Sequence, residues 1–150
     1  MQKILDRNHA SLIPLEELNT QQGKVWYLPH FDIYHPKNVD QIRVVFDCSA
    51  VFQDYSLNKH LLPGPDMKNR LTGVLSRFWK EETAVTCDIE QMFHGFYVNP
   101  EQGDFLRFLW FKDNDLAGQI VEYRMNVLLF GAVSSKGVTN FGLRVTAETA

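Results

Sequence analysis

Asp88 is the residue whose position in this sequence best fits metal chemistry. In "AVTCDIEQMFHGF" (residues 84–96), an apolar run ends at Asp88, and an aromatic residue, Phe93, follows five positions later. A carboxylate at the end of a buried strand, next to the backbone carbonyl of Ile89, offers Mg²⁺ hard oxygen ligands at a fixed position, as phosphoryl transfer requires. The alternative is that Asp88 caps the turn that follows it. One carboxylate does not complete a metal site, so the choice between metal ligand and turn cap depends on the other residues of the chain.

Other residue types that often do chemistry lack the spacing for it. Glu90 forms an Asp-x-Glu sequence with Asp88, whereas phosphatases with an aspartyl nucleophile use Asp-x-Asp and a Thr that is missing here. The histidines also lack the spacing typical of a metal site. They are His9, His30, His35, His60 and His94. Phosphatase and zinc-site interpretations are therefore set aside.

Composition limits the class of protein. A chain of 150 residues with 45% hydrophobic and 13% aromatic residues suits one packed domain spanning residues 1–150. Cys48 and Cys87 lie far apart and match no metal-ligand spacing, which favours reduced thiols. Charges interrupt the first thirty residues, and no apolar run is long enough to span a bilayer. We therefore expect an intracellular protein, cytoplasmic or nuclear, without a signal peptide or a membrane partner.

Charge is distributed unevenly along the chain. Residues 1–80 contain 10 Lys or Arg and 8 Asp or Glu, whereas residues 81–150 contain 5 and 10. A basic leading part and an acidic trailing part fit a phosphate-binding surface beside a carboxylate-rich metal site. Ordinary solvated charge is the alternative interpretation.

The first half of the sequence predicts a β-hairpin followed by a helix. Residues 24–34 and 42–50 are rich in aromatic and β-branched residues and predict two strands, joined by a turn-like connector at 35–41. Asp66 is placed to cap a helix that ends near Glu81. The apolar residues of this helix recur at spacings of three and four: Leu71, Val74, Leu75 and Phe78.

The second half predicts strands and a C-terminal helix. Strands are expected at 84–89, 105–111 and 120–131, the last two joined by a hairpin turn at 112–118. "PEQGD" (100–104) predicts a turn or short helix, and the tail from residue 134 begins as a loop and becomes helical. Since strands and helices do not alternate regularly, the predicted class is α+β with a mainly antiparallel sheet.

Eight segments in this order resemble the reverse transcriptase domain of Bel/Pao-type long-terminal-repeat retrotransposons. The resemblance runs from about residue 10 to the end, and the specificity comes from the order and spacing of the segments rather than from any one of them. They are "VWYLPHF", "IRVVFDCSA", "SLNKHLLPGPD", "GVLSRFWKEE", "AVTCDIEQMF", "LRFLWF", "EYRMNVLLFGAVSS" and "NFGLR". The resemblance implies a partial right hand, with fingers and a connecting helix at about 1–83 and the start of the palm at about 84–150.

The resemblance also implies roles for the acid and the aromatic of the opening segment. Asp88 matches the first catalytic aspartate of the palm, which with the Ile89 carbonyl binds Mg²⁺ or Mn²⁺ for two-metal nucleotidyl transfer. Phe93 matches the steric gate that excludes a ribose 2′-hydroxyl and so selects deoxynucleotides. Without the resemblance, Phe93 would be interpreted as a core aromatic.

Three further residues match the nucleotide-binding part of the family. Arg43 matches the fingers arginine that holds the triphosphate, a role that suits a planar, permanently charged guanidinium; an exposed strand arginine is the alternative. Phe130 and Gly131 match the loop that packs against the nascent base pair, where glycine permits close backbone approach. The sequence departs from the family at Lys136, where proline is usual, and at Leu128, where histidine is common.

The family's second metal-binding unit, a Tyr-x-Asp-Asp hairpin, does not occur in these 150 residues. The resemblance therefore implies a fragment of an RNA-directed DNA polymerase that works with template, primer, dNTP and the remaining polyprotein domains. We expect this chain alone to bind divalent metal weakly and to extend no primer. The alternative function is that of a non-catalytic nucleic-acid-binding remnant or a domesticated fold.

Overall fold

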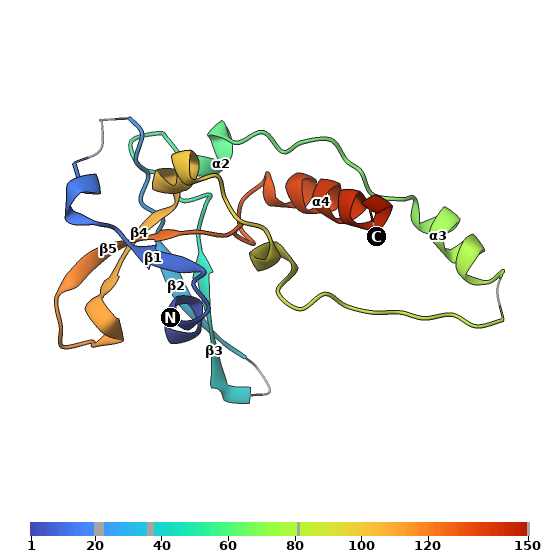
Figure 1. The fold of residues 1–150 in the computed structure, drawn as a ribbon, viewed down its shortest axis with the longest axis horizontal. Helices are drawn as coiled ribbons and strands as arrows, with labels where there is room; N and C mark the ends of the chain where they lie inside the picture. Colours follow the sequence, from blue (N-terminus) through green and yellow to red (C-terminus); the bar gives the residue numbers. More distant parts are fainter. Residues whose placement is uncertain (20–22, 36–37, 81, 150) are drawn as a thin grey trace.

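The protein combines two antiparallel sheets with short helices, as the predicted α+β class requires. The computed structural model describes residues 1–19, 23–35, 38–80 and 82–149. Figure 1 shows the two sheets and most of the short helices in one body, with α4 beside it and α3 at the far end of an extended excursion. None of the helices in these ranges combines the length and apolarity needed to cross a lipid bilayer.

The larger sheet has three strands in the order β1-β5-β4. β4 (Arg107–Phe111) and β5 (Ile120–Met125) form the predicted hairpin, and β1 (Ala10–Leu12) pairs with the other edge of β5. β5 ends at Met125, so the prediction that this strand runs to residue 131 is wrong. Beyond Met125 the chain continues outside any strand, with an isolated bridge between Val127 and Tyr97 and a few backbone hydrogen bonds, such as those to His9 and Phe96.

The smaller sheet is the predicted hairpin of β2 (His30–His35) and β3 (Asn38–Phe46). Its strands extend further than expected, because much of the segment proposed as a connector at 35–41 belongs to them; residues 36–37 lie outside the described residues. The register shifts after Tyr34, which marks a bulge near the tip. The pairing places Ile33 opposite Arg43.

Within the described residues, four α-helices and four 3₁₀ helices complete the fold. The α-helices are α1 (Gln2–Asp6), α2 (Leu57–His60), α3 (Leu71–Phe78) and α4 (Ser135–Thr149); the 3₁₀ helices are η1 (Leu15–Glu17), η2 (Met92–Gly95), η3 (Pro100–Leu106) and η4 (Lys112–Asn114). α3 is the helix predicted from its apolar spacing, η3 contains the predicted short helix, and α4 is the predicted tail helix. α4 begins at Ser135, so Lys136 lies in its first turn and does not prevent helix formation.

Two local details of α3 differ from the prediction. Its N-cap position is Arg70, and the Asp66 carboxylate instead accepts a hydrogen bond from the backbone N–H of Lys68. The helix ends at Phe78, three residues before the predicted end at Glu81, which itself lies outside the described residues. A short Asx-type turn at Asp66 thus replaces the expected cap.

The predicted strand at 84–89 is wrong. Residues 82–90 are exposed, and none of them belongs to a helix or strand. Figure 1 shows this segment as an extended connection that returns from α3, away from both sheets. A strand needs a neighbouring edge to receive its backbone hydrogen bonds, and an apolar, β-branched sequence cannot supply that edge by itself.

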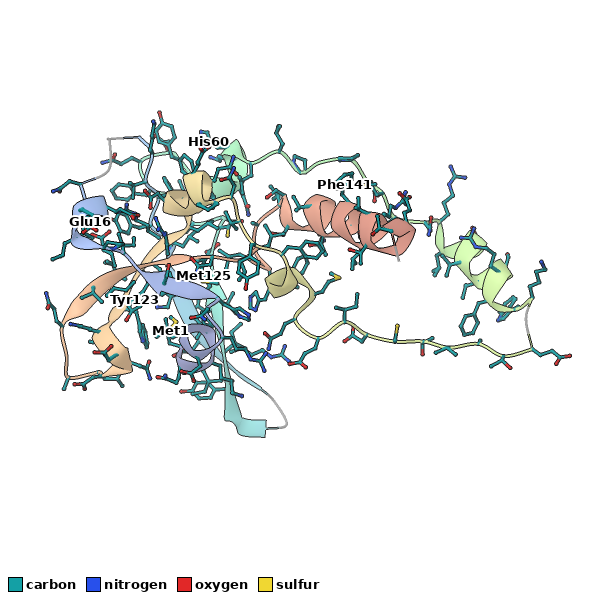
Figure 2. All side chains as sticks on the ribbon, viewed as in Figure 1. Met1, Glu16, His60, Tyr123, Met125 and Phe141 are labelled. Atoms are coloured by element: carbon teal, nitrogen blue, oxygen red, sulfur yellow. The ribbon has the colours of Figure 1, made fainter. Side chains whose placement is uncertain are left out.

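The core lies where the two sheets meet. Phe46 of β3 and Phe108 of β4 contact each other with ring centroids 5.0 Å apart, and Phe108 stacks on Tyr123 of β5 at 5.7 Å. Tyr123 and Met125, two positions apart on β5, are both buried and can be followed in Figure 2. Aromatic burial of this kind helps to hold the hairpin β2–β3 onto the larger sheet.

A fully buried arginine, which we did not foresee from the sequence, ties the N-terminal region to the larger sheet. Arg107 is 0% exposed. Its guanidinium pairs with Asp104 at 3.0 Å and Glu122 at 3.1 Å, and it donates to the backbone oxygen of Glu17 at 2.8 Å. Burial alone would lower the pKa of Arg107, but its hydrogen bonds with Asp104, Tyr27 and Glu122 and the charge of Asp104 raise it. The arginine therefore stays charged in the interior.

Two more exposed neighbours extend the network around Arg107. Tyr27 donates its hydroxyl to Glu122 at 2.7 Å, and Arg124 pairs with Glu17 at 2.6 Å. Burial and the hydrogen bond to Glu122 raise the pKa of Tyr27. The network links η1, the segment before β2, and strands β4 and β5, which are separated by up to about a hundred residues in the chain.

Candidate functional site

A hollow of about 360 Å³ lies beside Arg43 on β3, and we call it the Arg43 pocket. Its walls come from α1, the hairpin β2–β3, η2 and the loop between β5 and α4. The lining residues are Ile4, Ile33, Arg43, Val44, Val45, Phe46, His94, Leu129, Phe130 and Gly131. Three of the residues proposed from the sequence, Arg43, Phe130 and Gly131, therefore share one pocket.

The proposed steric-gate residue, Phe93, does not line the pocket but contacts one residue that does. Phe93 lies in η2 and contacts the Phe130 ring edge-on, with centroids 5.5 Å apart and planes at 76°. Phe93 is half-buried, while Phe130 is 81% exposed. An exposed aromatic ring and an arginine that line one hollow, with a second ring packed against the first, suit a flat, phosphorylated ligand.

Gly131 is required by a close approach of two backbone segments. A Cβ added at Gly131 would lie 2.8 Å from the carbonyl oxygen of Phe46 and 3.6 Å from the Cys48 sulfur. Any side chain would therefore push the loop away from the end of β3.

Cys48, which lies next to this contact, is buried, and burial, with a smaller effect of Asp47, raises the pKa of its thiol to about 11. Cys48 is therefore a packing residue, because the thiolate that nucleophilic chemistry needs does not form near neutral pH.

Asp88 and Ile89 are not among the residues that line the Arg43 pocket. Both are exposed on the extended segment that leads into η2. In the part of the chain that the structure describes, no group of three or more His, Cys, Asp or Glu side chains is arranged to hold a metal ion. The roles of Asp88 and Ile89 in binding Mg²⁺ or Mn²⁺ stay predictions.

A histidine pair lies beside the pocket. His9, just before β1, and His94 of η2 have ring centroids 4.8 Å apart, and His94 is shared with the Arg43 pocket. The Nδ1 atom of His94 is buried and makes no hydrogen bond. Arg7 and Glu90 pair at 3.4 Å in the same neighbourhood. The two histidines are far apart in the sequence, so spacing alone gave no signal of this contact.

The electrostatics of the pair favour neutral imidazoles. Burial is the main cause that lowers the pKa of His94, followed by His9 and Arg7; burial and Arg7 also lower the pKa of His9. Burial likewise lowers the pKa of His30 on β2. In each case the charged form loses hydration that the protein does not replace.

We expect the free energy of unfolding to fall as the pH drops below about 6.5, the ordinary histidine pKa. The unfolded chain binds these protons first because the folded pKa values are lower, so the stability is fully present above pH 6.5 and is lost on acidification. Urea unfolding at pH 7.5, 6.5 and 5.5 measures this. His94→Asn should reduce the dependence, and adding His30→Asn should reduce it further. A dependence unchanged in the double variant would contradict the assignment.

The chain matches no family model, and the search of curated proteins found no match. Its function therefore has to be argued from its residues and their geometry.

Proposed function

We propose that this chain is the fingers and opening palm portion of an RNA-directed DNA polymerase of the Bel/Pao retrotransposon type, and that the Arg43 pocket receives the incoming dNTP. The observation that supports this best is the convergence of Arg43, Phe130 and Gly131 around one hollow, with Phe93 in ring contact with Phe130. These residues come from segments up to 88 positions apart, and each had been assigned to nucleotide binding from the resemblance.

Each residue suits a different part of a nucleotide. The Arg43 guanidinium presents several planar donors to phosphate oxygens and keeps its charge at every relevant pH. Phe93 offers a ring edge against which a ribose 2′-hydroxyl would collide. Phe130 and Gly131 form an exposed wall on which a base pair can pack, because Gly131 has no side chain that would block its approach.

The metal donors fit Mg²⁺ in type but not in number. The Asp88 carboxylate and the Ile89 carbonyl are hard oxygen ligands, which Mg²⁺ prefers, but Mg²⁺ takes six ligands and nucleotidyl transfer uses two ions. When bound, the metal would activate the primer hydroxyl and stabilise the leaving pyrophosphate. The other ligands would be nucleotide phosphates, waters and the carboxylates of a Tyr-x-Asp-Asp segment, which these 150 residues do not contain.

Binding of dATP to the purified chain tests the proposal. We expect Arg43→Gln to weaken dATP binding, measured by calorimetry or NMR titration, about tenfold or more, since one charged hydrogen bond to phosphate contributes about 1.5–3 kcal/mol. Arg43→Lys should recover part of the affinity.

Arg70→Gln is the matched control, because it removes the same charge from an exposed position before α3. Equal weakening by Arg43→Gln and Arg70→Gln would show that only general charge attracts the nucleotide, and would contradict a site at Arg43.

A second candidate function is favoured by the position of Asp88. The Asp88 segment is exposed and belongs to no helix or strand, so Asp88 is not held in place as a metal ligand. A chain of this kind that binds nucleic acid would then do so without a metal centre. A non-catalytic nucleic-acid-binding remnant would bind a primer–template duplex with strong salt dependence and would bind dATP no better than it binds inorganic triphosphate. Comparing these affinities in the same chain separates the two candidates.

A further inference from the structure

One polar side chain outside the Arg43 pocket connects both sides of it. Asn58 of α2 donates through Nδ2 to Ser49 Oγ at 2.8 Å and to the Gly131 carbonyl oxygen at 3.0 Å. Its Oδ1 accepts from the backbone N–H of Val133 at 3.0 Å. Both amide donors and one acceptor position are thus occupied, which is nearly the full capacity of an asparagine side chain.

These bonds join three segments that are distant in the sequence. Ser49 follows β3, Asn58 lies in α2, and Gly131 and Val133 belong to the loop between β5 and α4. The backbone N–H of Asn58 also donates to the Cys48 carbonyl at 2.9 Å, which fixes α2 against the end of β3. The hydrogen bonds of Asn58 therefore fix the distance between the end of β3 and the loop that contains Gly131.

The wall that Asn58 holds has little packing of its own. Phe130 and Gly131 are exposed, whereas Leu129 and Ala132 on either side are buried and anchor the loop to the core. Losing the Asn58 bonds should therefore shift the exposed wall without unfolding the loop. A Cβ at Gly131 would lie only 2.8 Å from the Phe46 carbonyl oxygen, so the loop has little room to move inward, and we expect it to move outward and widen the pocket.

We propose that Asn58 is a positioning residue that sets the width of the Arg43 pocket by holding Phe130 and Gly131 against the end of β3. The inference rests on the proposed function for its ligand, a deoxynucleoside triphosphate. It adds a residue that touches no ligand, acts through the backbone of the loop, and lies on an element that is not part of the pocket.

The test compares Asn58→Ala with Asn99→Ala in the full 150-residue chain. Asn99 is the matched control, because its Oδ1 caps η3 by accepting from the Glu101 N–H, away from the Arg43 pocket. Both variants should lose stability in urea unfolding, Asn58→Ala the more, because it loses three side-chain hydrogen bonds and Asn99→Ala loses one. Only Asn58→Ala should shift the amide resonances of Phe130 and Gly131 and weaken dATP binding, by about fivefold to tenfold, as loss of a few hydrogen bonds predicts.

A partial variant sharpens the result. Asn58→Asp keeps the acceptor for the Val133 N–H but places an oxygen where the donor to the Gly131 carbonyl was. Its dATP affinity relative to wild type should be low at pH 7.5 and should rise towards pH 4, near the ordinary Asp pKa of about 3.9, where a protonated carboxyl can donate to that carbonyl again. A role in stability alone would show no such rise relative to the wild type at the same pH.

The outcomes separate the two claims. If wild type binds dATP and Asn58→Ala binds it equally well, the positioning role is overturned. If wild type binds no dATP, the proposed function is overturned, and the amide resonances still decide the positioning role. Unchanged Phe130 and Gly131 resonances in Asn58→Ala would overturn it in the free chain as well.

Discussion

Arg107→Ala is expected to lower the free energy of unfolding by about 3–5 kcal/mol, as removal of one partner from a buried ion pair does. The substitution leaves the Asp104 and Glu122 carboxylates partly buried without their main counter-charge, and it removes the hydrogen bond to the Glu17 carbonyl. Urea unfolding followed by circular dichroism measures the loss. For a chain of this size such a loss is a large share of the total stability.

Arg124→Ala is the control for this prediction. Arg124 pairs with Glu17 and Asp104 but keeps access to water, its side chain being 22% exposed. We expect it to cost about 1–2 kcal/mol, as loss of a partly solvated charged hydrogen bond does. If Arg107→Ala cost no more than Arg124→Ala, burial of the Arg107 charge would not be a principal constraint on this fold.

Asp88→Asn and Phe93→Ala are expected to fail in different ways in a polypeptide that also carries a Tyr-x-Asp-Asp segment. Asp88→Asn should remove detectable incorporation of both deoxyribonucleotides and ribonucleotides, because a neutral amide would replace the carboxylate proposed to bind the metal. Phe93→Ala should retain incorporation and admit ribonucleotides, because removing the ring removes the clash with the 2′-hydroxyl. Single-nucleotide primer extension with dATP and ATP measures both effects.

Phe111→Ala is the matched control for the steric gate. Phe111 is a half-buried phenylalanine at the end of β4, and it is not among the residues that line the Arg43 pocket. Its removal should cost stability and leave the choice of sugar unchanged. Sugar discrimination that is unaltered in Phe93→Ala would rule out the gate even if the Asp88 prediction held.

The sequence by itself determined the elements that depend on neighbouring residues. Turn residues at 112–118 and strand-forming residues on both sides specify the β4–β5 hairpin, and the spacing of apolar residues specifies α3. In both cases the interactions that form the element lie within a few residues of one another, so a local pattern contains the information. The family resemblance added the candidate roles of Arg43, Phe93, Phe130 and Gly131.

Only the tertiary structure decided the features that depend on distant partners. Residues 84–89 have the composition of a strand, but they form none, because no sheet edge lies beside them to take up their hydrogen bonds. Conversely, β1 forms because β5 offers an edge more than a hundred residues later. The Arg107 network and the Asn58 hydrogen bonds could not be predicted from the sequence for the same reason, because each joins polar groups from segments that are far apart in the chain. Local sequence preference indicates which element a segment can form, and pairing with distant segments determines whether it forms and which residues it contacts.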